Sequence, residues 1–241
     1  MTDHTVRAYD EELSQLRTMI AQMGGLAEEQ LGNAIEALIK RDTGLADEVI
    51  AGDSRIDALE RQIEERAILT IARRQPMARD LREIMGAIRV SSDLERIGDL
   101  AKNTAKRAHA IPDGLPRKLV SGLARMGQLA QEQLNNILDA YAQADDEKAM
   151  AVWRADEELD ALYNSIFREL LTYMMEDPRN ISLCTHLLFG AKNMERIGDH
   201  TTNIAENIAY MISGRNIAGE RPKKDVTSLT AVAAPGTGST T

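Results

Sequence analysis

An internal repeat constrains the fold of this chain more than any other feature of its sequence. With a shift of 103 residues, MGGLAEEQLGN at 23–33 aligns with MGQLAQEQLNN at 126–136, with eight identities in eleven positions. With a shift of 100 residues, the segment ERIGD at 95–99 aligns with a second ERIGD at 195–199. The offset drifts by only three residues, so the loops changed length while the order of the elements was kept. This pattern indicates a duplication.

Each half of the repeat carries the pattern of three long helices. Apolar residues recur at helical spacing, as in Leu16, Ile20 and Met23. We expect helices over 9–40, 45–73, 77–110, 116–141, 145–175 and 180–213. The segment IPDGLP at 111–116 separates the halves. The sequence therefore predicts an all-α protein of two tandem, sequence-related three-helix bundles, residues 5–110 and 116–214.

The composition agrees with this class and excludes others. Hydrophobic residues make up 43% of the chain but aromatic residues only 3%. The apolar residues are mainly Ala, Leu, Ile and Met, which favour helices, so an all-β sandwich is excluded. Residues 215–241 are instead rich in Gly, Pro, Ser and Thr, and we expect them to form a disordered tail.

The charge balance and the cysteine count narrow the function. The chain has 29 basic and 38 acidic residues, a net charge of -9. Such a chain is not expected to bind nucleic acid, which selects basic surfaces and stacking aromatics. Cys184 is the only cysteine, so a disulfide framework is excluded. No stretch of 18 uncharged apolar residues occurs, and we expect a soluble, cytoplasmic protein.

Four acidic pairs recur at equivalent places in the two halves. They are Asp53/Asp57, Glu95/Asp99, Asp156/Asp160 and Glu195/Asp199. A spacing of four residues places both carboxylates on one side of a helix, where like charges cost a few tenths of a kcal/mol. The pairs therefore need a compensating cation, either Lys or Arg or a bound metal. Sites made only of oxygen ligands suit Mg, Mn, Ca or Fe better than Zn.

Residues beside the acidic pairs have two interpretations each. Arg96 and Arg196 are either salt-bridge partners across helices or ligand-facing groups. Asn103 and Asn203, one turn after the acids, either complete a ligand shell or bridge helices. The acids themselves have a plainer interpretation, as solvated residues on long helices. The glycine of each ERIGD costs about 1 kcal/mol in a helix interior, so we expect it to permit close approach of a neighbouring helix.

Known catalytic motifs are absent from the sequence. It has no nucleophilic triad, phosphate-binding loop, GxGxxG or HExxH. The Glu-x-x-His motif of di-iron bundles is also missing, because Lys106, Leu183 and Ile197 stand three residues before the histidines at 109, 186 and 200. This absence weakens a ferritin-like oxidase interpretation.

The duplicated layout resembles the PhoU family of bacterial phosphate-uptake regulators over about residues 5–214. The most specific segments are SSDLERIGDLAKNTAKRA at 91–108 and KNMERIGDHTTNIAENI at 192–208. The E/D-x-x-x-D motifs of the family fall on the four acidic pairs, so the resemblance implies a divalent or multinuclear metal there (Fe, Mn, Mg or Zn). Because Lys102 stands where the second half has Thr202, the two sites need not bind equally.

The resemblance also implies a function. The protein would be a cytoplasmic, non-enzymatic homodimer that represses the phosphate-starvation response. Its partners would be the sensor histidine kinase of that response and the ATPase subunit of the phosphate ABC importer, so it would reach the membrane only through them. Two alternatives remain from the residues alone: a carboxylate-bridged metalloenzyme, hydrolase or oxidase, and a structural bundle without metals.

Overall fold

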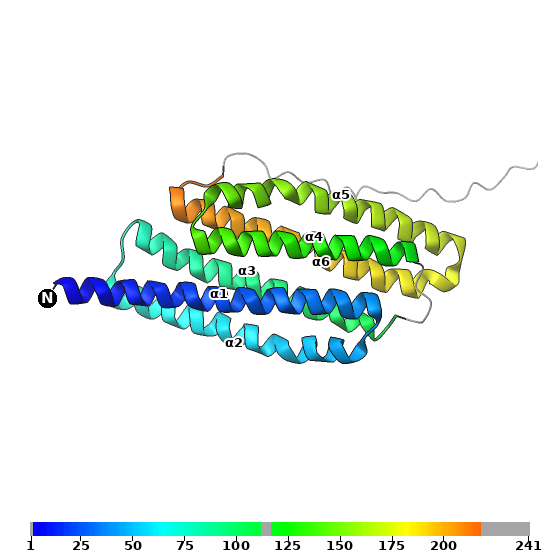
Figure 1. The fold of residues 1–241 in the computed structure, drawn as a ribbon, viewed down its shortest axis with the longest axis horizontal. Helices are drawn as coiled ribbons and strands as arrows, with labels where there is room; N and C mark the ends of the chain where they lie inside the picture. The colour runs from blue at the N-terminus through cyan, green and yellow to red at the C-terminus, as the bar shows by residue number, and fades with distance from the viewer. Residues whose placement is uncertain (1, 112–116, 218–241) are drawn as a thin grey trace, which may run out of the picture.

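The computed structural model describes residues 2–111 and 117–217, and these form six long α-helices (Figure 1). The helices are α1 (Thr2–Lys40), α2 (Thr43–Arg74), α3 (Arg79–Ala108), α4 (Arg117–Gln143), α5 (Asp146–Glu176) and α6 (Ile181–Ser213), and a short 3-10 helix, η1, spans Pro178–Asn180. No strand occurs within the described residues. The predicted all-α class is confirmed, as is the arrangement of two three-helix units.

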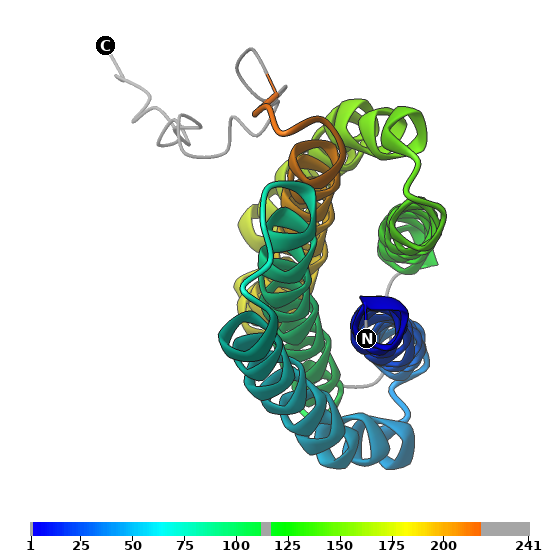
Figure 2. The same ribbon diagram turned by 90° about the vertical axis from the view of Figure 1, so that its left-hand side faces the viewer.

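The six helices pack as two bundles joined along one interface. Helices α1, α2 and α3 pack on one another, as do α4, α5 and α6. Viewed end-on, α2, α3, α6 and α5 follow one another in a curved row, with α1 and α4 on its concave side (Figure 2). The units meet along α3 and α6, which run antiparallel, and also along α1 and α4, where Ile35 faces Gly127. Asn193 donates a hydrogen bond to Thr104 toward one end of the α3–α6 interface, and Gly86 faces Met211 toward the other.

Local signals set where the helices begin and end, and one of them is repeated. Asp42 caps α2 by accepting a hydrogen bond from the backbone of Leu45, and Asp145 caps α5 in the same way from Lys148. These aspartates are 103 residues apart, the offset of the repeat. Such caps satisfy backbone N–H groups that have no partner inside the helix. At the other end of the chain, α6 stops at Gly214, whose φ of 71° suits a left-handed cap.

Glycines bring the helices of each unit into close contact. A Cβ on Gly98 would lie 2.9 Å from Cδ1 of Ile56 on α2, and a Cβ on Gly198 would lie 2.5 Å from Cδ2 of Leu159 on α5. The expectation that the ERIGD glycines permit close approach is confirmed. Both positions lie beside the acidic pairs, so this close packing determines how the carboxylates face one another.

The ends of the chain complete the description. Ile217 packs against the core just beyond α6, and the predicted disordered tail falls mostly at 218–241, outside the described residues. The segment 112–116, where the sequence placed the break between units, also lies outside them. None of the helices in the described part of the chain has a stretch long and apolar enough to span a membrane.

Two adjacent glycines of α1 offer a test of this packing. A Cβ on Gly25 meets nothing within 4 Å, whereas a Cβ on Gly24 would lie 2.4 Å from Cδ2 of Leu138. Gly25→Ala should raise the free energy of unfolding by about 0.5–1 kcal/mol through helix propensity alone. Gly24→Ala has the same propensity gain but displaces Leu138, so it should be less stable than Gly25→Ala by about 1 kcal/mol or more. Urea unfolding measures both, and equal effects would contradict the packing of α1 on α4.

Candidate functional site

The fold brings the acidic pairs of each unit together on neighbouring helices. Asp53 and Asp57 lie on α2 beside Glu95 and Asp99 on α3. The ammonium of Lys102 contacts both helices, at 2.5 Å from Oδ2 of Asp53 and 2.6 Å from Oδ1 of Asp99. The four predicted residues of the first unit therefore form one cluster, which we call the first carboxylate cluster.

Lys102 neutralises the first carboxylate cluster from within. Burial disfavours its charged form, but hydrogen bonds to Asp53 and Asp99 outweigh this and raise the pKa of Lys102 above its usual value. The lysine therefore stays charged under all ordinary conditions. Asp53 is buried, so its negative charge depends on this ammonium for compensation.

Glu60 also belongs to the first carboxylate cluster, although the repeat did not point to it. Burial, and then the charge of Asp99 and of Glu60, raises the pKa of Glu95. The pKa of Glu60 is raised by burial and by its acidic neighbours Glu64 and Asp57. The edge of the cluster away from Lys102 is therefore rich in mutually repelling carboxylates.

The second carboxylate cluster, formed by Asp156, Asp160, Glu195 and Asp199 on α5 and α6, is more deeply buried. Asp156, Asp160 and Glu195 are only 2%, 3% and 4% exposed. The ammonium of Lys192 lies 2.9 Å from Oε1 of Glu195, while Oε2 of that residue is buried without a hydrogen-bond partner among the described residues. Burial raises the pKa of Glu195. Lys192 acts to lower this pKa, whereas the charges of Asp199 and Asp160 raise it further.

The two clusters obtain their positive charge from different positions. Lys102 stands three residues after Asp99, whereas Lys192 stands three residues before Glu195. Both spacings place the lysine on the same face of its helix as the acids. Lys192 also lies 4.9 Å from the ring centroid of Tyr163, which is the repeat equivalent of Glu60. The repeat conserved the carboxylates, but the residues around them differ in charge.

A buried glutamine underlies each cluster, and sequence reasoning missed both. Gln30 of α1 and Gln133 of α4 are 103 residues apart, and the side-chain oxygen of each is buried without a hydrogen-bond partner among the described residues. Gln133 donates a hydrogen bond to the backbone oxygen of Ala155, one residue before Asp156. The repeat could have pointed to these glutamines, because both fall within the segment with eight identities in eleven positions.

Of the predicted supporting residues, Arg96 lies farther from its carboxylate than the lysines do from theirs. Nε of Arg96 is 3.6 Å from Oε2 of Glu95, and this arginine side chain is 63% exposed. Arg196 is exposed, and Asn103 is half-buried. Asn203 reaches across the α3–α6 interface, where it donates to Asp93 at 3.3 Å.

The His200 imidazole joins Asn203 at the α3–α6 interface. Its Nδ1 lies 2.9 Å from Oδ1 of Asp93, and Asn207 donates to the other oxygen of that carboxylate. Asp93 therefore connects the two units through three side chains of α6.

The clusters differ in how well they would accept a metal. Among the side chains that the structure describes, those of residues 9–111 and 119–217, no three His, Cys, Asp or Glu converge in the arrangement of a metal site. In the first cluster, Lys102 occupies the place between Asp53 and Asp99 that a cation would take. In the second, the unpartnered Oε2 of Glu195 is a buried acceptor that a cation would satisfy. Metal binding thus remains a prediction, and the second cluster fits it better.

These features define a class: a duplicated six-helix protein with one buried carboxylate cluster in each three-helix unit. The model of the PhoU domain matches the chain twice, at residues 20–108 and 123–208. The chain belongs to the PhoU family.

Full-length relatives and solved structures agree with this assignment. A protein of Rhizobium meliloti, named phosphate-specific transport system accessory protein PhoU homolog, is 59% identical over 93% of this chain and 95% of its own length. A protein of the same name from Caulobacter vibrioides is 52% identical, over 95% of this chain and all of its own. The crystal structure of PhoU from Pseudomonas aeruginosa superposes with a TM-score of 0.81 at 39% identity, over 86% of this chain and 100% of the other. PhoU from Streptococcus pneumoniae, described as a phosphate transport system regulatory protein, gives 0.80 at 28% identity, over 87% and 99%.

The buried state of Glu195 predicts a pH dependence of stability. Because its pKa in the folded protein is raised above the usual 4.5, the folded state binds this proton more tightly than the unfolded chain. The free energy of unfolding contributed by this group therefore falls as pH rises from the unfolded pKa through the folded one. The free energy of unfolding, measured with urea, should therefore fall less in Glu195→Gln than in the parent between mildly acidic and neutral pH. Glu158→Gln, at an exposed glutamate of α5, serves as the control, and parallel curves for the parent and Glu195→Gln would contradict the burial.

Proposed function

We propose that this protein regulates phosphate uptake as a non-catalytic accessory of a phosphate-specific transport system. The main support for this proposal is that nearly the whole chain is similar to proteins named for that role. The match covers both units and is not confined to one shared segment. The names of these relatives, accessory and regulatory protein, favour a binding role over catalysis.

The finer part of the proposal concerns partners. The protein acts in the cytoplasm as a homodimer and lowers the output of the phosphate-starvation response when phosphate is plentiful. It does so by contacting the membrane sensor histidine kinase and the ATPase subunit of the phosphate importer. Three exposed apolar side chains support a contact role: Met77 lies just before α3, and Leu81 and Met85 lie one turn apart in its first half.

Deletion of the gene in its native bacterium tests the proposed function. The deletion strain should take up phosphate constitutively and keep the kinase response switched on in phosphate-rich medium. Complementation with the parent chain should restore repression, and the kinase and the importer ATPase should co-purify with it. Normal repression in the deletion strain would refute the proposal.

We further propose that the second carboxylate cluster binds a metal, with Fe, Mn, Mg and Zn as candidates. Asp156, Asp160 and Glu195 would supply oxygen ligands, and the cation would offset the burial and the acidic neighbours that raise the pKa of Glu195. Lys192 would have to leave Glu195 when the metal enters. In the first cluster the resident Lys102 already supplies a positive charge, so binding there should be weaker.

Thermal unfolding with added Mn²⁺ tests this difference between the clusters. A metal that binds only the folded form stabilises it by ~2.7 kcal/mol at a hundredfold excess over its dissociation constant. Asp160→Asn should abolish most of this stabilisation, whereas Asp57→Asn, at its repeat equivalent, should retain it. Lys102→Met, which frees Asp53 and Asp99, should destabilise the metal-free protein and increase the response to Mn²⁺. Equal losses in Asp160→Asn and Asp57→Asn would contradict a preference for the second cluster.

A further inference from the structure

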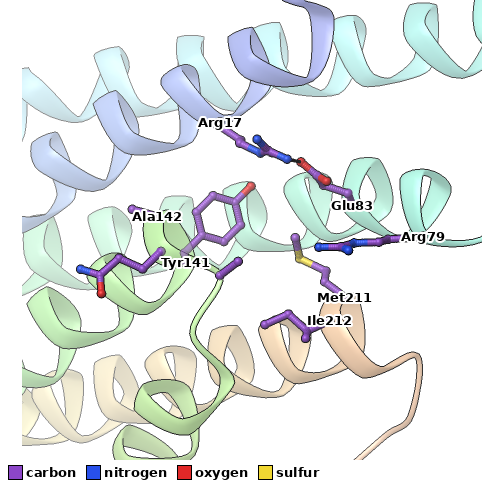
Figure 3. A pocket seen from close by; sticks show the side chains of 9 residues that line it. Arg17, Arg79, Glu83, Tyr141, Ala142, Met211 and Ile212 are labelled. Atoms are coloured by element: carbon purple, nitrogen blue, oxygen red, sulfur yellow. Dashed lines mark hydrogen bonds and ion pairs between the residues drawn. The ribbon is translucent and has the colours of Figure 1, made fainter. Parts of the chain in front are cut away.

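A cavity of about 270 Å³ lies between the two units at one end of the molecule, well away from the carboxylate clusters (Figure 3). The first unit contributes α1 and α3 to its walls, and the second contributes α4, the turn after it and α6. The side chains that give it chemical character are Arg17, Arg79, Glu83, Tyr141, Met211 and Ile212. The cavity therefore has both charged and apolar lining residues, and both halves of the repeat contribute to it.

The charged groups of the cavity leave one positive charge in excess. Nε of Arg17 donates to Oε1 of Glu83 at 2.6 Å, so these two neutralise each other. Arg79 has no ion-pair partner among the side chains of residues 9–111 and 119–217, and its guanidinium extends toward Met211 (Figure 3). The hydroxyl of Tyr141 points toward the Arg17–Glu83 pair. Burial raises the pKa of Tyr141, so its phenol stays neutral and is able to donate a hydrogen bond.

The repeat supplies an internal control for this arrangement. At the equivalent position in the other half of the repeat, Arg79 has a counterpart in Arg179, but four other lining residues are replaced by apolar ones. The equivalents of Arg17, Glu83, Tyr141 and Met211 are Val120, Leu183, Leu38 and Ile111. Leu38, Leu183 and Ile111 are buried in the core. The fold therefore does not require the Arg17–Glu83 pair or Tyr141 at this position, and their presence at one end is a property of this sequence.

We propose that this cavity binds a small organic anion whose carboxylate or phosphate group pairs with Arg79. The planar guanidinium donates two parallel hydrogen bonds to either acidic group. Met211 and Ile212 offer an apolar surface to the body of the ligand, and Tyr141 offers a hydrogen bond to a polar substituent. Inorganic phosphate alone is too small, because five heavy atoms displace roughly the volume of a few waters of about 30 Å³ each.

Occupancy of the cavity would couple the two units. Arg79 belongs to α3 of the first unit, whereas Tyr141 and Met211 belong to α4 and α6 of the second. A ligand in contact with all three adds contacts across the interface between the units, and so it stabilises the folded form by mass action. This inference does not depend on the proposed role in phosphate transport.

Methionine-methyl NMR provides a direct test on the full chain. Met211 lines the cavity, whereas Met85 is exposed on α3 and does not. The protein labelled with [methyl-13C]methionine is titrated separately with glycerol 3-phosphate, AMP, citrate and inorganic phosphate, and Met211→Leu assigns the signal. We expect at least one organic probe to move the Met211 signal saturably and to raise the melting temperature, with no change at Met85. The phosphate-ester and carboxylate probes distinguish the two acidic groups.

Substitutions then locate the binding. Arg79→Gln should weaken binding of the same probe by at least about tenfold, and Tyr141→Phe should weaken it less. Arg179→Gln is the matched control, since Arg179 is the exposed repeat equivalent of Arg79. The proposal is overturned if no organic probe moves the Met211 signal at millimolar concentration, or if Arg79→Gln binds as the parent does. Binding of inorganic phosphate as tight as that of every organic probe would also overturn it.

Discussion

The antiparallel packing of α3 against α6 is the contact on which the rest of the structure depends. Each of these helices is the third of its unit and carries that unit's ERIGD segment, so the interface sets the distance between the two carboxylate clusters. It is fastened by polar contacts between the units, with Asp93 accepting hydrogen bonds from Asn203 and Asn207 and pairing with His200. Without it, each unit would expose one face of its third helix to water.

The second governing constraint is the burial of negative charge between helices. Glycines allow α2 and α3, and likewise α5 and α6, to approach closely enough that their carboxylates share one environment. Buried carboxylates are costly unless a cation accompanies them, and each cluster carries one lysine for this purpose. The two lysines differ in how many carboxylates they neutralise. Lys102 bridges two helices, while Lys192 contacts one oxygen of Glu195 and leaves the other without a partner among the described residues.

The sequence determined the fold almost completely and the site only in part. Six helices and their pairing into units followed from the repeat, because long apolar stripes and short loops leave few other arrangements. The eight acids could be named for the same reason. The lysines could not be assigned, since residues three before and three after an acid reach the same helix face, and the repeat gives them no common position. Gln30 and Gln133 were missed because a polar residue on an amphipathic helix is expected to face water.

The relation between the two halves has a consequence for the history of the chain. A single unit that paired its third helix with a second copy would form an isologous interface, in which every contact occurs twice. The joined chain does not obey this rule. Asp93 pairs with His200 on one side of the pseudo-twofold axis, whereas its equivalent, Asn193, binds Thr104 on the other. Once the halves were joined in one chain, each could change without matching itself across the axis. The two ends of the molecule therefore differ chemically, which is impossible in a symmetric pair of identical half-length chains.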